Sequence, residues 1–322
     1  MEIGALVLKW QNFENFELNK GYKALRISSK CIPDLYIAID NDGFRCLILY
    51  LPHSIDIKLK NNDKEKLKLS YLPLEKIILI KLNDPDFIDL FNDLIVSLYL
   101  KIKDLTDPDY YSKELIYSFY KWADFFDDKF KSRLSNEEIK GVFGELFVLN
   151  EFLKQSDSKT VDTILESWKG PYNTTNDFIL DDKNIEVKTK DESKHFIKIS
   201  SEYQLEKEFG KTLELLVVSV KIDMIKGVSI HDLIKQATIY IRKNLGDLSI
   251  LYHTLAQIGL TIESATEYNN YRFAVTKTNL YDCGQENFPK LSVSNIPEEV
   301  TKLNYNLRTA TLDNFMLEEK TY

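Results

Sequence analysis

The spacing of apolar residues predicts a strand-rich beginning to the chain. Four short segments have the apolar content and the length of β-strands: 35–39, 45–51, 67–72 and 77–80. The turn sequence Asn41-Asp42-Gly43 separates the first two, which predicts a hairpin. In the third segment Leu67, Leu69 and Tyr71 share one face. Residues up to about 82 therefore predict a β-rich module.

A change to helical spacing marks the end of this module. Apolar residues recur with helical periodicity over 87–102, and Asp107-Pro108-Asp109 then interrupts the pattern. We place a domain boundary at this interruption. The expected organisation is a β-rich module over 1–106 that ends in a helix, followed by a second domain over 107–322.

The second domain alternates helices and strands. Helices are expected over 115–130, 135–154, from about 201 and across 231–246, and strands over 177–180, 184–189 and 213–222. Ser135 and Glu138 have the spacing of a capping box, which marks the start of the second of these helices. From about Leu260 the residues favour β-structure, and we expect a C-terminal extension there that is mainly β-strand. This order of elements predicts an α/β (α+β) fold.

Composition and charge narrow the classes of function. The 322 residues include 44% hydrophobic and 29% charged residues with only 11 Gly and 8 Pro, which excludes disordered and collagen-like proteins. The 42 Lys and Arg against 50 Asp and Glu give a net charge of −8. A global basic field is therefore excluded, and any phosphate-binding surface must be local.

Cysteine and histidine give no sign of a disulfide framework or a zinc site. The three cysteines are widely spaced without a C-x-x-C pair, and the four histidines lack metal-binding spacing. Charged residues interrupt the longest apolar stretch, 77–100, and the acid at position 2 does not fit a secretory signal. We expect a cytoplasmic protein without membrane association, whose chemistry rests on carboxylates and lysines.

Glu145 is the first candidate for that chemistry. It falls on the apolar stripe of its predicted helix, in the same row as Val142 and Leu149. A carboxylate there loses hydration at a cost unless a cation compensates for it. Gly141 and Gly144 flank it and allow another backbone or a ligand to approach the helix. The alternative is an acid at the edge of the stripe that reaches water.

Three more candidates come from two neighbouring strands. Asp177 precedes the first strand, and the second alternates so that Glu186 and Lys188 project from one face. If 181–183 closes a hairpin, Asp177 lies beside them. Two or three such carboxylates hold Mg²⁺, and a nearby lysine stabilises charge on a phosphodiester under attack. The common alternative is an ion pair between Glu186 and Lys188 on a solvated strand.

Five short motifs in this order resemble the PD-(D/E)XK nuclease superfamily. They are G-x-F-G-E-L at 141–146, S-W-K-G-P at 167–171, N-D-F at 176–178, I-E-V-K-T at 185–189 and I-S-S-x-x-Q-L at 199–205. More narrowly, the sequence resembles a bacterial family of PD-(D/E)XK proteins often encoded near restriction and phage-defence genes. The resemblance implies a restriction-endonuclease-like core, with a central mixed sheet flanked by helices.

The resemblance also implies roles for single residues. The implied catalytic and metal-binding residues are, in chain order, Glu145, Asp177, Glu186, the main-chain carbonyl of Val187, Lys188 and Gln204. The carboxylates and the carbonyl would hold the metal, and Lys188 would be the catalytic lysine. The implied cofactor is Mg²⁺, with Mn²⁺ as a substitute. Asn176 stands where the superfamily's name has proline, at a position that varies widely.

Gln204 and a group of basic residues have two interpretations each. Gln204 matches a polar position at the start of the next core helix, while Ser201 and Gln204 also have capping-box spacing that explains the glutamine locally. Three lysines beyond the E-x-K strand flank a histidine: Lys190, Lys194, Lys198 and His195. They form either a phosphate-contacting patch or a solvated charged loop. Trp168 and Pro171 are interpreted as structural.

Three functions fit these residues. The first is a Mg²⁺-dependent endonuclease that cuts DNA in restriction or phage defence. The second is a non-cleaving or partner-dependent nucleic-acid-binding subunit that keeps the nuclease fold, which the net charge of −8 supports. The third is a phosphodiesterase acting on RNA or a small molecule. Because cutting both strands usually needs two sites, the expected partners include a second copy of the chain or a defence-system protein.

Overall fold

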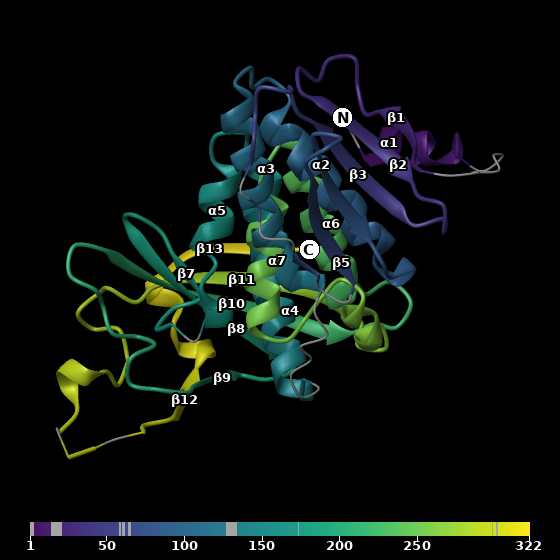
Figure 1. Cartoon of the computed structure of the whole chain (residues 1–322). Coiled ribbons are helices and arrows are strands. Elements are labelled where there is room, and N and C mark those ends of the chain that lie inside the picture. Colours follow the sequence, from purple (N-terminus) through teal and green to yellow (C-terminus); the bar gives the residue numbers. More distant parts are fainter. Residues whose placement is uncertain are drawn as a thin grey trace. The chain divides into compact units, whose positions relative to one another are not determined.

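The computed structural model divides the chain into two compact units, Met1–Lys129 and Phe130–Tyr322 (Figure 1). The structure describes residues 3–13, 21–57, 59, 62–63, 66–126, 134–172, 174–297, 299–300 and 302–322. In the described part of the chain, no helix combines the length and the apolar character that crossing a bilayer requires. All three cysteines are buried and free of disulfides.

The first unit is built on an antiparallel sheet. Its strands are β1 (Lys23–Arg26), β2 (Asp34–Ile39), β3 (Arg45–Tyr50), β4 (Asn62–Asp63), β5 (Leu67–Leu72) and β6 (Ile77–Leu82), in the order β1-β2-β3-β6-β5-β4. The expected hairpin is present, since β2 pairs with β3 and Gly43 takes the left-handed conformation in the turn. The prediction of a β-rich beginning agrees with this sheet.

Three helices complete the first unit: α1 (Ile3–Gln11), α2 (Ile88–Ile102) and α3 (Pro108–Ala123). The helix expected over 115–130 is α3, which begins earlier and ends at Ala123; residues 127–130 lie outside the described residues. Asp107 and Pro108 start this helix rather than break the chain, because the Asp107 carboxylate accepts the Asp109 N–H at 3.1 Å and proline suits the first helical position.

The position of α3 also moves the boundary between the two units. Apolar residues of α3, among them Leu115, Phe119 and Trp122, are almost fully buried, and α3 packs with α2 inside the first unit. The compact first unit therefore extends to Lys129, whereas the sequence break suggested a boundary at 106/107.

The second unit contains a mixed sheet. Its strands are β7 (Phe178–Ile179), β8 (Lys183–Asp191), β10 (Thr212–Ile222), β11 (Phe273–Asp282) and β13 (Met316–Thr321), in the order β13-β11-β10-β8-β7. Only the β8–β10 pair is parallel among these neighbours. A separate antiparallel pair is formed by β9 (Phe196–Ile199) and β12 (Tyr305–Arg308). The mixed sheet and its flanking helices confirm the expected α+β class.

The helices of the second unit are α4 (Asn136–Gln155), α5 (Val161–Ser167), α6 (Ile230–Lys243) and α7 (Leu248–Gln257). The capping box of Ser135 and Glu138 is present in both directions at the start of α4. The sequence pattern did not predict α5 or α7. Short 3₁₀ segments lie at Pro85–Phe87, Asp124–Phe126, Gly170–Tyr172, Ser264–Tyr268, Val293–Asn295, Thr309–Thr311 and Asp313–Phe315.

The helix expected from about Ser201 is absent, so that prediction was wrong. Residues 201–208 form turns that end before β10. The Gln204 side chain folds back and accepts the N–H of Ser200, four residues earlier, at 2.8 Å, while Leu205 is buried in the apolar core. These two contacts hold the segment as a compact turn.

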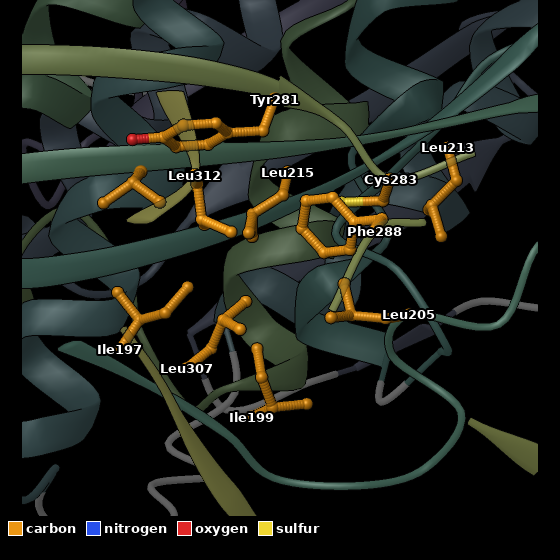
Figure 2. Close-up of a cluster of buried hydrophobic side chains, with 11 residues drawn as sticks. Ile197, Ile199, Leu205, Leu213, Leu215, Tyr281, Cys283, Phe288, Leu307 and Leu312 are labelled. Atoms are coloured by element: carbon orange, nitrogen blue, oxygen red, sulfur yellow. The ribbon is translucent and has the colours of Figure 1, made fainter. Parts of the chain in front are cut away.

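The two faces of the mixed sheet have different coverings. Helix α4 lies against β8, on the face that Ile185, Val187 and Thr189 present by strand alternation. The opposite face is covered by an apolar cluster from β9, β10, β11, β12 and their connections (Figure 2). Its members from β10, Leu215 and Val217, are in register with Glu186 and Lys188 of β8. The E-x-K side chains therefore emerge on the face of this cluster.

The close approach of α4 to β8 leads to a prediction at Gly144. A Cβ at this position would overlap the Thr189 Oγ1 atom and lie 3.1 Å from the Thr189 Cβ. We expect Gly144→Ala to destabilise the protein by about 1–3 kcal/mol through overpacking. Chemical denaturation would measure the change in the free energy of unfolding.

Gly141 on the same helix is the matched control. A Cβ there meets no atom within 4 Å, so Gly141→Ala should stabilise the helix by up to about 1 kcal/mol through its higher propensity. Equal effects of the two substitutions would contradict the packing argument. Thr189→Ala added to Gly144→Ala should recover part of the loss, because it removes the overlapping hydroxyl.

Candidate active site

The site lies at an open edge of the mixed sheet. Strand β7 is only two residues long and pairs with β8 at Ile185 and Asn184, so it leaves the next residues of β8 uncovered on that side. The main-chain N–H of Val187 instead donates to Asp177 Oδ2 at 2.7 Å. Since the N–H and C=O of one strand residue point to the same side, the Val187 carbonyl also faces this edge.

The segment after α5 fixes Asp177 from the other direction. The N–H groups of Lys169 and Gly170 donate to the Asp177 carbonyl oxygen at 2.7 and 3.0 Å. Trp168 forms an antiparallel bridge with Phe178, and both side chains are fully buried. The W-K-G-P motif therefore packs around Asp177, which precedes β7, and Phe178, which begins it.

Helix α4 brings Glu145 to the same place. Its Oε2 atom accepts a hydrogen bond from the Trp168 indole Nε1 at 2.8 Å. The sequence analysis treated Trp168 as structural and missed this contact. The signal was the S-W-K-G-P motif itself, but only the fold shows that an indole N–H, which must find a partner when buried, points at this carboxylate.

Glycine at position 170 leaves room between two carboxylates. A Cβ built there would overlap Glu145 Oε2 and lie 2.8 Å from Asp177 Oδ1. The two oxygens therefore converge beside the Gly170 Cα, where any other residue type would press its Cβ against both. Carboxylate oxygens that converge in this way are the hard ligands that a divalent cation such as Mg²⁺ or Mn²⁺ prefers.

Glu186 and Lys188 form a tight pair beside this point. Lys188 Nζ lies 2.6 Å from Glu186 Oε1, with the glutamate side chain 2% exposed and the lysine side chain 16% exposed. The alternative of a solvated surface ion pair is therefore wrong for Glu186. Both side chains of this pair are largely buried, so solvent and salt screen their interaction less than at the surface.

Asn176 supports Glu186 from the second carboxylate oxygen. Its buried amide Nδ2 lies 3.4 Å from Glu186 Oε2 and donates to the Gln204 carbonyl oxygen at 2.9 Å. The residue that replaces the proline of the superfamily's name thus positions Glu186. Gln204 reaches the site through its main chain, while its side-chain oxygen is committed to Ser200.

The electrostatics of the site favour protonated acids when no cation is bound. Burial, and then the neighbouring charge of Asp177, raises the pKa of Glu186 to about 8, against the opposing effect of Lys188. Burial and the charge of Asp177 raise the pKa of Glu145 well above its ordinary value, although the Trp168 hydrogen bond lowers it. Burial also raises the pKa of Asp177, against Lys188 and the Val187 N–H.

The acidic residues of the site do not form a three-ligand metal cluster; Glu145 is paired with Asp177, and Glu186 with Lys188. Within the described ranges, no group of three or more His, Cys, Asp or Glu side chains is arranged to hold a metal ion. Glu145 and Asp177 face the point at Gly170, whereas Glu186 is turned toward Lys188 and Asn176. A cation at the site would thus be held first by Glu145 and Asp177.

The basic residues beyond the E-x-K strand do not form an unopposed positive patch. Asp191 lies between two lysines, at 2.6 Å from Lys140 Nζ and 3.4 Å from Lys194 Nζ. Lys190 Nζ donates to the Lys194 carbonyl oxygen at 2.9 Å. Lys198, on β9, and His195 are exposed, and within the described residues neither side chain has an acidic partner.

This arrangement, a short edge strand beside an E-x-K strand with a helix acid against them, defines an α+β protein with a restriction-endonuclease-like fold. The family model DUF4420, described as "Putative PD-(D/E)XK family member", matches residues 7–310, and the chain belongs to this family. The resemblance found in the motifs is thereby confirmed. Neither the curated proteins nor the solved structures contain a match to the chain.

The raised pKa of Glu186 predicts a pH-dependent stability of the metal-free protein. The folded state holds the proton up to about pH 8, whereas the unfolded state loses it near the ordinary value of 4.5. The free energy of unfolding should therefore fall as pH rises from 4.5 to 8, by up to about 1.4 kcal/mol per pH unit from this group.

Glu186→Gln isolates this contribution. The variant keeps the shape but cannot titrate, so its melting temperature in EDTA should depend less on pH between 5 and 8 than that of the wild type. Circular dichroism melts at several pH values give the comparison. If the melting temperatures of the two proteins changed with pH to the same extent, Glu186 would be ionised in the folded state and the prediction would be wrong.

Proposed function

We propose that this protein is a metal-dependent endonuclease that hydrolyses DNA phosphodiester bonds. The observation that carries the proposal is the point at Gly170, where Glu145 Oε2 and Asp177 Oδ1 converge beside the Glu186–Lys188 pair. Converging carboxylates with a lysine beside them are the groups that metal-assisted phosphodiester hydrolysis uses. Family membership supports a nuclease-like reaction.

Each residue has a task in this proposal. Glu145 and Asp177 would hold Mg²⁺ or Mn²⁺, with the Val187 carbonyl on the same open edge. The cation, when bound, would neutralise charge that develops on the phosphate oxygens. Lys188, held by Glu186, would donate a hydrogen bond to a phosphate oxygen and stabilise the same charge. Trp168 and Asn176 position the two glutamates.

The wider setting of the proposal comes from the resemblance in the sequence. We place the activity in restriction or phage defence, in the cytoplasm, on DNA. Because two strands must be cut, the proposal includes a second copy of the chain or a defence-system partner. RNA remains an alternative substrate, since the site residues face a phosphodiester and not its sugar.

A partner-dependent or non-cleaving nucleic-acid-binding subunit is the second candidate function. Its support is electrostatic: the net charge is −8, and the lysines near the site are accompanied by acids. Such a protein would gain phosphate contacts from a partner. Tight DNA binding without turnover in Mg²⁺ or Mn²⁺ would favour this candidate.

Cleavage of supercoiled plasmid tests the first proposal. Wild-type protein should nick or linearise the plasmid with Mg²⁺ or Mn²⁺ and not with EDTA. Lys188→Ala should lower the rate by about 10²–10³-fold, because one preorganised donor to the transition state is lost. Lys183→Ala is the matched control, since Lys183 lies on the same strand, pairs with Glu214 and belongs to the opposite face. Full metal-dependent cutting by Lys188→Ala would refute the mechanism.

Gly170→Ala tests the metal site without reference to turnover. The added Cβ would occupy the point between Glu145 and Asp177. We expect the dissociation constant for Mn²⁺, measured by calorimetry, to rise at least about tenfold, equivalent to about 1.4 kcal/mol. Gly141→Ala, with open space around its Cβ, should bind Mn²⁺ as the wild type does. Unchanged affinity in Gly170→Ala would place the cation elsewhere.

A further inference from the structure

A hollow lies on the same face of the mixed sheet as Glu186 and Lys188. It has a volume of about 360 Å³, and residues of β8, β10, β11, β13 and the 3₁₀ turns before β13 line it. Alternation along β8 places Lys190, which lines the hollow, on the face that carries Lys188. We call this hollow the sheet pocket.

The register of the sheet connects the sheet pocket to the E-x-K strand. Lys188 is in register with Val217 of β10, Val217 with Asn279 of β11, and Asn279 with Glu319 of β13. The last three of these residues line the pocket. The row that begins at the proposed catalytic lysine therefore continues across the floor of the pocket.

The charges around the sheet pocket cancel. The lining contains three lysines and three acids: Lys190, Lys194, Lys277, Glu192, Asp313 and Glu319. Lys277 and Glu319 are paired at 3.0 Å, and Asn279 donates to Glu319 at 2.8 Å. A site for a free phosphate would carry excess positive charge. This lining suits an uncharged ligand that both donates and accepts hydrogen bonds.

Tyr281 provides an independent sign of a ligand. It is only 3% exposed, yet among the described residues no group forms a hydrogen bond with its hydroxyl. Figure 2 shows the ring above Leu312 with its oxygen directed away from Cys283 and Phe288. Tyr281 also lines the sheet pocket. Burial, together with the charges of Asp313 and Glu319, raises the pKa of Tyr281 to about 12, so the hydroxyl keeps its proton.

The chemistry of the sheet pocket suits a nucleobase. Met316 supplies apolar surface for a flat ring, and the Tyr281 hydroxyl and the Asn279 amide oxygen supply polar groups for its edge. Bases turned out of a helix are held by enzymes in pockets of this mixed kind. We propose that the sheet pocket holds a nucleobase turned out of the DNA strand whose backbone lies at the E-x-K edge.

This inference rests on the proposed action on DNA, but it can be tested without cleavage. The probe is a pool of random-sequence duplexes with 2-aminopurine in place of scattered adenines, because the fluorescence of this base rises when it leaves the stack. Protein is added in Ca²⁺ under conditions where a gel shows intact DNA. Anisotropy of a terminal dye gives affinity in the same samples.

Three variants make the measurement specific. Ala310 is exposed at the rim and lines the pocket, so Ala310→Trp should fill the pocket without disturbing the core. Thr311→Trp is the matched control, because Thr311 is exposed in the same turn but does not line the pocket. Tyr281→Phe removes only the hydroxyl that lacks a partner.

We expect the wild type and Thr311→Trp to raise the fluorescence, and Ala310→Trp to abolish the rise and weaken binding severalfold. Tyr281→Phe should reduce the rise while its melting temperature changes little, since the described residues give this hydroxyl no hydrogen bond that the variant would lose. A structural role for that hydroxyl would lower the melting temperature instead.

Several results would overturn the inference: no fluorescence rise with the wild type, absence of DNA binding, or the same rise with Ala310→Trp. The outcome is separable from that of the plasmid assay. Cutting without a fluorescence rise would leave the nuclease proposal standing and reject the base pocket. A pocket-dependent rise without cutting would support the pocket and favour the non-cleaving candidate.

Discussion

The second unit is organised around an electrostatic constraint, the placing of three carboxylates next to a single lysine at one sheet edge. Burial raises the pKa of Glu145, Asp177 and Glu186, and the charge of Asp177 raises the pKa of the two glutamates further. Such groups are costly unless hydrogen bonds or cations compensate. The protein supplies Glu145 with a donor from Trp168, Asp177 with the Val187 main-chain N–H, and Glu186 with donors from Lys188 and Asn176. These donors offset part of the cost, and a bound cation would offset the rest.

The backbone around the site follows from the same constraint. Strand β7 begins only at Phe178, opposite Ile185, which leaves the Val187 N–H to a carboxylate in place of a sheet partner. Glycine at 170 keeps the approaching segment clear of two carboxylate oxygens, and glycine at 144 lets α4 lie close enough to β8 for Glu145 to reach them. A side chain at either glycine would alter the distance between helix and strand on which the acid pair depends.

Local patterns predicted the parts of the site that depend on local geometry. The period of two in β8 placed Glu186 and Lys188 on one face, and the capping box located the start of α4. Such local patterns could not predict contacts between segments that are distant in the sequence. The pairing of Trp168 with Glu145 joins α4 to the segment after α5, and the turn at Gln204 depends on Asn176 and on the burial of Leu205. In the sequence Asp107-Pro108 resembled the end of a helical segment. Its role in starting a helix could be recognised only once the helix that follows, α3, was known to begin at Pro108.

The distribution of polarity over the sheet bears on how an acidic protein can engage DNA. The row through Glu186, Leu215 and Tyr281 is covered by the apolar cluster, whereas the next row, from Lys188 to Glu319, opens into the sheet pocket. With a net charge of −8 and lysines accompanied by acids, long-range attraction to phosphate is weak. Under the proposed action on DNA, affinity would come from close contacts, namely the cation at the edge and a base in the pocket next to it. Both contacts would lie beside the E-x-K residues, so recognition of the strand would also position it for chemistry.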